Sequence, residues 1–416
     1  MFKKKALSFN IKILFLFFTI FLFFFNAKFS NLAHKPLKII NKSQNNNDIF
    51  LKINETQNSI KSYYNYFNIC NNLIKLNNKK KSINKHPFVS ICIPVYNTEK
   101  YIERAVLSII NQSFQDFEII IVNDCSNDNT LNIIKRLQKE DDRIRLINHT
   151  KNSGVYNCRS QAALNANGKY ILFLDPDDLI LNQNLLENLY NYNSYYNLDI
   201  IEFLVYHKKE KKNDIYYPKS FKLNHNHKYK NKIICQPELS DIIFFTPNTK
   251  AHIDIICRTI WNKIYRKELI LKSIEYIGEE YYFNNNLIVA DDTFLNIINF
   301  HFAKNYSIIR IGGYLYNVRS SSMSNGFISI NHRIKQNISY FFYFKLLYKY
   351  IKDFEKDRNF LYNEININKK RIIEFKKLHI NDYLEKVKLF LYEIKNDEKS
   401  SELLKNLMNN LLLKLN

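Results

Sequence analysis

From Phe88 onward, short apolar runs alternate with longer polar stretches. The runs 88–95, 117–122, 144–147 and 170–174 have the length of β-strands. The stretches between them carry apolar residues at helical spacing, which predicts a helix after each of the first three strands. These helices begin near Ile102, Leu131 and Val155. Alternation of this kind predicts an α/β fold, with a mostly parallel sheet, right-handed crossovers and helices on both faces.

The amino terminus has a different pattern. Three lysines at positions 3–5 precede an apolar run at 13–25, and the segment 6–29 comes close to the ~20 residues that span a bilayer. A cleaved signal peptide is the alternative, since its apolar core is typically ~7–15 residues long. Because the residues at 26–28 form a poor cleavage site, we expect an uncleaved signal-anchor helix over residues 1–30.

Residues 31–86 are polar and rich in Asn and Lys, so they can bury little surface and are expected to form a stem or linker. Residues 87–330 carry the strand and helix pattern and form the main domain. From 331 to 416 the apolar residues recur at helical spacing, which predicts a helical carboxyl-terminal extension. These helices could pack on the main domain or pair with another chain, as in an oligomer.

Composition narrows the class of protein. The chain has 416 residues, of which 46% are hydrophobic, and a formal net charge of +22. Such a charge is typical of proteins that bind nucleic acid, but here the basic residues are scattered and no nucleic-acid-binding motif is present. We therefore expect no nucleic-acid partner. The six cysteines form no C-x-x-C pair, which argues against a cysteine-bound metal cluster.

An acidic turn follows the apolar run at 170–174. Its residues are Asp175, Pro176, Asp177 and Asp178. In open α/β sheets, ligands bind beyond the carboxyl ends of the strands, and carboxylates two positions apart can share one hard cation such as Mg²⁺ or Mn²⁺. Taken alone, an Asp-x-Asp turn is more often simply solvated.

Seven segments decide between a solvated turn and a cation site. They are Val89–Asn97, Gln112–Ile120, Asn123–Thr130, Asn152–Tyr170, Trp261–Glu268, Ala290–Phe294 and Tyr314–Arg319. Together with the acidic turn they resemble motifs of the family 2 glycosyltransferases, which have the GT-A fold. Two positions depart from the family's Asp-Asp-Gly-Ser signature, because Asn123 replaces the first Asp and Cys125 replaces the Gly.

The resemblance implies a nucleotide-sugar donor, most simply a UDP-sugar, and a divalent cation, Mn²⁺ or Mg²⁺, bound by Asp175 and Asp177. Asp178 would only orient its neighbours. The residues that the resemblance places around the donor are Pro94, Tyr96, Asn97, Asp124, Ser126, Arg159, Asp175, Lys263 and Arg319. For Arg159, Lys263 and Arg319 a role as ordinary surface charges is nearly as well supported by the sequence.

Transfer by one direct displacement inverts the anomeric carbon and needs one base for the acceptor hydroxyl. The resemblance assigns this role to Asp292, with Asp291 as the alternative. Two carboxylates at the start of a helix also stabilise its dipole, which is the simpler explanation of the pair. The acceptor would be a glycan, a lipid or a protein.

Two other functions compete. A catalytically silent GT-A domain could serve as a partner of another transferase, and the departures at Asn123 and Cys125 favour it. A nucleotidyltransferase is less well supported, because the loop 94–98 contains no glycine to cradle phosphates. An anchor, a stem and a distal enzyme domain also resemble the type II arrangement of Golgi transferases. We therefore expect a single-pass Golgi or endomembrane protein with a luminal catalytic domain.

Overall fold

The computed structural model describes most of the chain after position 83. The described residues are 84–209, 215–216, 232–236, 239, 259–278, 291–318, 330–354, 356, 358–378 and 381–416. The expected anchor at 1–30 and almost all of the expected stem lie outside them, as does Arg319. Among the described residues, no helix is both long enough and apolar enough to cross a membrane.

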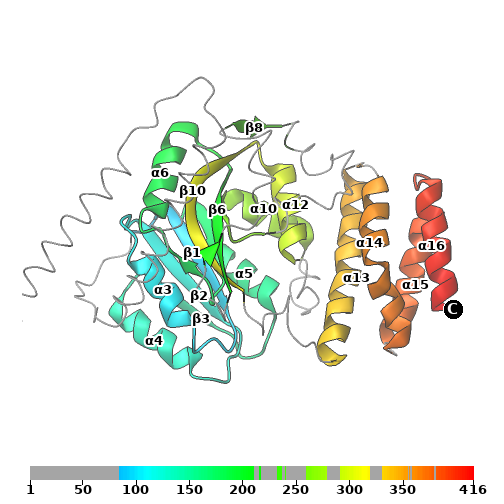
Figure 1. Cartoon of the computed structure of the whole chain (residues 1–416), viewed down its shortest axis with the longest axis horizontal. Helices are drawn as coiled ribbons and strands as arrows, with labels where there is room; N and C mark the ends of the chain where they lie inside the picture. Colours follow the sequence, from blue (N-terminus) through cyan, green and yellow to red (C-terminus); the bar gives the residue numbers. More distant parts are fainter. Residues whose placement is uncertain are drawn as a thin grey trace, which may run out of the picture. The chain divides into compact units, whose positions relative to one another are not determined.

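The elements follow one another as the apolar pattern predicts in the first half of the domain (Figure 1). They are β1 (Val89–Val95), α3 (Ile102–Ile110), β2 (Phe117–Asn123), α4 (Thr130–Glu140), β3 (Ile144–Asn148), α5 (Val155–Leu164), β4 (Tyr170–Phe173), β5 (Leu179–Ile180), α6 (Leu185–Tyr196), β6 (Ile200–Lys209), β7 (Ile215–Tyr216), β8 (Ile233–Cys235), β9 (Lys263–Arg266), α10 (Lys267–Ile277), α12 (Asp291–Phe302), β10 (Asn305–Val318), α13 (Ile330–Asp353), α14 (Arg358–Lys377), α15 (Asn381–Asn396) and α16 (Glu402–Leu415).

One sheet joins the described strands in the order β3-β2-β1-β4-β9-β6-β10-β5, with β7 beside β6 and β8 beside β10. The strands β1 to β4 are parallel, as expected. The second half combines both directions. β10 runs parallel to β6, whereas β9 is antiparallel to β4 and β6, and β10 is antiparallel to β5 and β8. The prediction of a mostly parallel sheet therefore holds for β1 to β4, but the described sheet as a whole is mixed.

The order in which strands are added to the sheet switches at β1, because β2 and β3 lie on one side of it and β4 lies on the other. Val89 pairs with Phe117 of β2 on one side and with Tyr170 of β4 on the other. Right-handed crossovers then place α3 and α4 on one face and α5 on the other, where α10 lies beside it (Figure 1). Such a switch point opens a crevice at the carboxyl ends of β1 and β4, where ligands bind in open α/β sheets.

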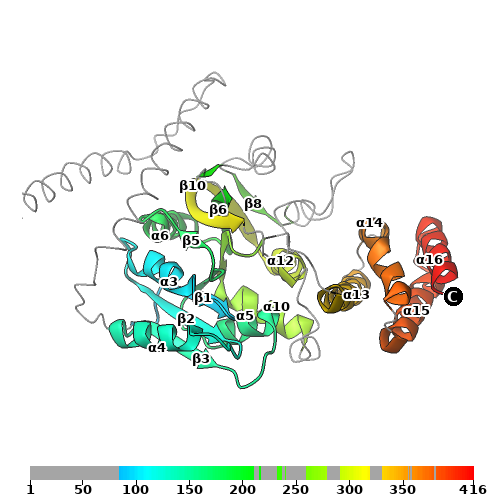
Figure 2. The ribbon, with the colours of Figure 1, turned by 60° about the horizontal axis from the view of Figure 1, so that its bottom comes forward.

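The carboxyl-terminal residues form the expected helices, and α13 contacts the main domain. The hydroxyl of Tyr350 lies 3.1 Å from Nδ1 of His301 on α12. Tyr276 of α10 donates to the carboxylate of Asp353 at 2.8 Å. In the view of Figure 2, α14, α15 and α16 follow α13 as further helices. The reading in which these helices pack on the main domain is thus supported for α13.

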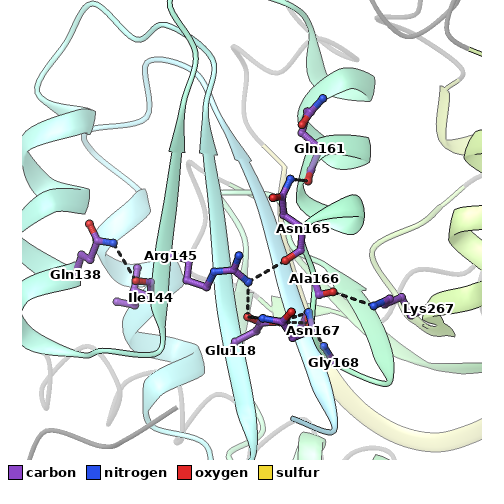
Figure 3. A network of polar contacts seen from close by, with 11 residues as sticks. Glu118, Gln138, Ile144, Arg145, Gln161, Asn165, Ala166, Asn167, Gly168 and Lys267 are labelled. Carbon is purple, nitrogen blue, oxygen red and sulfur yellow. Dashed lines mark hydrogen bonds and ion pairs between the residues drawn. The ribbon is translucent and has the colours of Figure 1, made fainter. Parts of the chain in front are cut away.

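A buried carboxylate fixes the turn that leads into β4 (Figure 3). Glu118, on β2, accepts hydrogen bonds from Ser90 Oγ at 2.7 Å, from the Asn167 backbone at 2.5 Å and from Arg145 at 2.8 Å. Ser90 in turn accepts from the Gly168 backbone. Burial raises the pKa of Glu118, but these hydrogen bonds and the Arg145 charge outweigh it, so its pKa is lowered.

We expect Glu118→Gln to destabilise the fold by ~1–3 kcal/mol, because the amide cannot accept every hydrogen bond that the carboxylate accepts in a buried site. Urea unfolding would measure this change. A lowered pKa means that ionised Glu118 stabilises the fold above its ordinary value of 4.5, and that this contribution is lost as the pH falls. The variant should therefore lose less stability than the wild type below pH 4.5. Glu103→Gln, which breaks an exposed pair with Arg136, should cost at most ~1 kcal/mol.

Candidate active site

Two loops at the carboxyl ends of β1 and β2 are joined by hydrogen bonds. The Asn97 backbone donates to Ser126 Oγ at 3.0 Å, and the Asn127 backbone donates to Asn97 Oδ1 at 2.8 Å. Pro94 is buried within β1, whereas the ring of Tyr96 is 49% exposed. These two loops thus contain four of the residues expected around the donor, namely Pro94, Tyr96, Asn97 and Ser126. Among them, Tyr96 exposes its ring to solvent.

We call these two loops, residues 94–98 and 123–128, the rim of the site. Asp124 connects the rim to the start of α5. Its carboxylate accepts from the backbone of Ser153 at 2.7 Å, from Ser153 Oγ at 2.9 Å and from the backbone of Gly154 at 2.8 Å. His149 Nδ1 lies 3.2 Å from the same carboxylate. Asp124 is 4% exposed, so its first role is to hold the loop between β3 and α5.

Residues of β10 form hydrogen bonds with the turn that follows β4. Tyr314 donates its hydroxyl hydrogen to Asp178 at 2.8 Å and accepts from the Asp175 backbone at 3.2 Å. The backbone of Asn317 donates to Asp178 at 2.8 Å, and its side chain donates to the carbonyl of Asp177 at 2.5 Å. Together these bonds fix the backbone of the acidic turn.

Asp178 differs from its two acidic neighbours because it has no exposed surface. Burial, followed by the charges of Asp177 and Asp175, raises its pKa well above the ordinary value. Asp175 and Asp177 are partly exposed. The structure thus gives Asp178 the orienting role expected of it, and leaves the other two carboxylates accessible.

Arg159, on α5, lies between two elements that are distant in the sequence. One arm of its guanidinium donates to Asp175 at 2.9 Å, and the other donates to Asp292 at the start of α12. The expected metal ligand and the expected base are therefore neighbours of one guanidinium. For Asp291 only the backbone is described, so the structure does not distinguish the pair by side-chain position.

The donor set of the acidic turn fits a hard divalent cation. Asp175 and Asp177 offer carboxylate oxygens at the open end of β4, and Mg²⁺ and Mn²⁺ prefer such ligands. Another group, Asp124, His149 and Cys158, has donor atoms within 4.8 Å of one another. Its nitrogen and sulfur would suit Zn²⁺ better, but Ser153 and Gly154 already bond to Asp124, so the cluster is explained as a hydrogen-bonded one.

Lys263 belongs to a different group of polar residues. Its side chain has no exposed surface, and its ammonium donates to the Thr259 carbonyl at 2.8 Å and to Asn262 Oδ1 at 2.7 Å. Glu202 lies 3.4 Å away, and Tyr306 also donates to that carboxylate. These contacts give Lys263 a place in a buried network between β6, β9 and β10.

Sequence reasoning overlooked the residues that position the site. Tyr314 and Asn317 belong to the Tyr314–Arg319 motif, in which only the arginine drew attention. No local pattern connects them with the acidic turn, because the hydrogen bond between Asp175 and Tyr314 joins positions 139 residues apart. His149 and Ser153 flank a motif that was recognised, and their contact with Asp124 follows from the pairing of β2 with β3.

Comparison with known proteins agrees with this geometry. Residues 90–274 match the profile of glycosyl transferase family 2. This part of the chain belongs to that family. The match covers β1 through most of α10, and so includes the rim, the acidic turn and Arg159. The mixed α/β sheet with flanking helices is accordingly a GT-A fold.

The relatives of this family 2 domain include two Bacillus subtilis proteins. EpsJ, an uncharacterized glycosyltransferase, is 28% identical over 57% of this chain and 63% of its own length. TuaG, a putative teichuronic acid biosynthesis glycosyltransferase, is 43% identical over 23% of this chain and 38% of its own length. The chain thus spans less than two thirds of each. Among solved structures, Staphylococcus aureus TarS with UDP-GlcNAc matches at 19% identity with a TM-score of 0.45, over 79% of this chain and 81% of that one.

These comparisons overturn one expectation. The single-pass Golgi or endomembrane location is wrong, because the similar proteins named above are bacterial and no described helix could span a membrane. The expectation rested on the run at 13–25 and the polar segment after it, which lie outside the described residues.

Cys125, one of the two departures from the family signature, provides a test of the rim. Its φ is +61°, a left-handed conformation that costs a residue with a Cβ roughly 1–2 kcal/mol. Glycine avoids this cost but adds ~0.5–1 kcal/mol of unfolded-state entropy. We therefore expect Cys125→Gly to raise the free energy of unfolding by about 0.5–1 kcal/mol, measured by thermal or urea denaturation.

Gly154 supplies the control of opposite sign, since its φ is +88°. Gly154→Ala should lower stability by more than ~1 kcal/mol, because alanine cannot adopt this conformation without strain. Equal effects of both substitutions would show that the backbone conformations of the rim differ from those described.

Proposed function

We propose that this protein is a glycosyltransferase that moves a sugar from a UDP-sugar to an acceptor in a single displacement with inversion. One observation carries the proposal. Partly exposed Asp175 and Asp292, which come from the end of β4 and the start of α12, converge on Arg159 at the crevice of the sheet. A candidate cation ligand and a candidate base thus share one guanidinium, which supports their acting in the same site.

The rim at β1 and β2 is the proposed site of the nucleotide. Tyr96 offers an exposed ring for a base, and Asn97, Asp124 and Ser126 line the same loops. α5 connects this region to the acidic cluster. From Val155, beside Asp124, to Arg159 the helix rises about 6 Å, which suits a nucleotide whose base and diphosphate lie at the two ends.

Asp175 and Asp177 would hold the divalent cation, which when bound stabilises the negative charge of the departing diphosphate. The protein's own contribution is to keep both carboxylates aimed at the crevice. Tyr314 and Asn317 do this through the backbone of the turn and through Asp178.

Asp292 is proposed to accept the proton of the acceptor hydroxyl. Its carboxylate is 21% exposed and forms an ion pair with Arg159, so it is held in place at a position that solvent reaches. A glycan is the acceptor we favour among glycan, lipid and protein, because the relative TuaG is named for teichuronic acid biosynthesis.

The silent-domain alternative drew its support from Asn123 and Cys125. Asn123 donates to Asn148 Oδ1 at 2.7 Å, across the pairing of β2 with β3, and Cys125 adopts the left-handed conformation that the family's glycine allows. The rim therefore accommodates both departures. Since the carboxylates at 175, 177 and 292 are all retained, catalysis is the better-supported reading.

The test is turnover of a panel of nucleotide sugars by the purified full-length chain with Mn²⁺ or Mg²⁺. We expect UDP-sugars to be consumed, and Asp177→Ala to abolish turnover even at saturating Mn²⁺. The substitution should change stability little, because it truncates a partly exposed side chain. Near-normal turnover by a folded Asp177→Ala protein would refute the cation site.

Replacing the base should affect the chemical step alone. We expect Asp292→Asn to lower kcat by roughly 10²–10⁴-fold, the usual contribution of a general base. The dissociation constant of the UDP–Mn²⁺ complex, measured by calorimetry, should change little. A parallel loss of nucleotide affinity would instead assign Asp292 to the donor site.

A further inference from the structure

The side chain of Arg159 is almost completely buried, although both of its carboxylate partners are partly exposed. Its exposed fraction is 6%, compared with 24% for Asp175 and 21% for Asp292. The guanidinium is therefore shielded from solvent, while each of its two carboxylate partners is partly accessible. A side chain that bound the donor directly would be expected to face the crevice itself.

We propose that Arg159 is a positioning residue, which sets the base Asp292 at a fixed place relative to the donor-side carboxylate Asp175. The inference rests on the proposed function, since it assigns the geometry of that same site. It gives Arg159 a role other than the donor contact implied by the family resemblance.

The chemistry of the guanidinium suits this role. Its planar fork carries donors on two separate nitrogens, so it can hold two carboxylates at once in fixed directions. Here Nη2 bonds to Asp175, and Nη1 bonds to Asp292, which lies 133 positions further along the chain. Misplacing a reacting group by 1 Å can cost about 10²-fold in rate, so a link that fixes Asp292 relative to Asp175 would act on kcat.

The arrangement also predicts how Arg159 acts on the cation. A guanidinium 2.9 Å from Asp175 repels any further positive charge at that carboxylate. Removing it should therefore strengthen the binding of free Mn²⁺. If Arg159 were instead a ligand of the diphosphate, its removal would chiefly weaken the binding of the nucleotide.

The experiment is a double-mutant cycle with Arg159→Met and Asp292→Asn in the full-length chain. We expect Arg159→Met to lower kcat by about 10²-fold, with a nearly unchanged dissociation constant for UDP–Mn²⁺. In the Asp292→Asn background the same change should have almost no further effect on kcat, because the group that Arg159 positions is already lost. Free Mn²⁺, titrated by electron paramagnetic resonance, should bind Arg159→Met more tightly than wild type.

Two further variants complete the design. Arg159→Lys keeps the charge, but its single ammonium cannot reproduce the fork, so its kcat should stay well below that of wild type. It serves as the test variant if Arg159→Met does not fold. Arg136→Met removes an exposed, ion-paired arginine on α4 and should leave kcat unchanged.

The outcomes separate the two hypotheses. If wild type consumes no nucleotide sugar, the proposed function fails, and the positioning role fails with it. If wild type is active but the two substitutions multiply in their effects on kcat, the function stands and the positioning role is wrong. A large loss of UDP–Mn²⁺ affinity in Arg159→Met, or weaker binding of free Mn²⁺, would also overturn it in favour of a donor contact.

Discussion

The hydrogen bond between the Tyr314 hydroxyl and the buried carboxyl of Asp178 is the contact on which the site depends. A buried carboxyl without partners is strongly unfavourable, so the acidic turn could not take this shape unless another element supplied donors. β10 supplies them, through Tyr314 and Asn317. Once Asp178 is satisfied, Asp175 and Asp177 are left at the open end of β4. The second half of the sheet thus determines where the carboxylates of the first half point.

The first half of the fold could be predicted because its information is local. Each strand from β1 to β4 is a short apolar run, and α3 and α4 each have one apolar face, so windows of about ten residues contain the pattern. The acidic turn follows for the same reason. The antiparallel placement of β9 could not be predicted in this way, because it depends on pairing with β6, about sixty residues earlier.

The lack of long-range information in a local window also explains why the contacts of the site residues could not be predicted. Lys263 has the sequence context of a phosphate ligand, yet its burial is determined by Glu202 and Tyr306, which no local window includes. Arg159 was equally compatible with a surface position, because its partner Asp292 lies on a distant helix. The position of a charged residue in the sequence does not show which residue it pairs with. Sequence patterns therefore select candidate residues, but they do not show what each candidate contacts.

The two departures from the family signature show which parts of this site can vary. The rim is held largely by hydrogen bonds between side chains and the backbone, as between Asn97 and Asn127, so its shape survives a change at Asn123 and a left-handed Cys125. Such positions require a conformation or a donor, and more than one residue type can provide it. In the proposed mechanism the carboxylates at 175, 177 and 292 are different, because each brings negative charge to a defined point. Substitution there would remove a charge that no adjustment of the loops can replace.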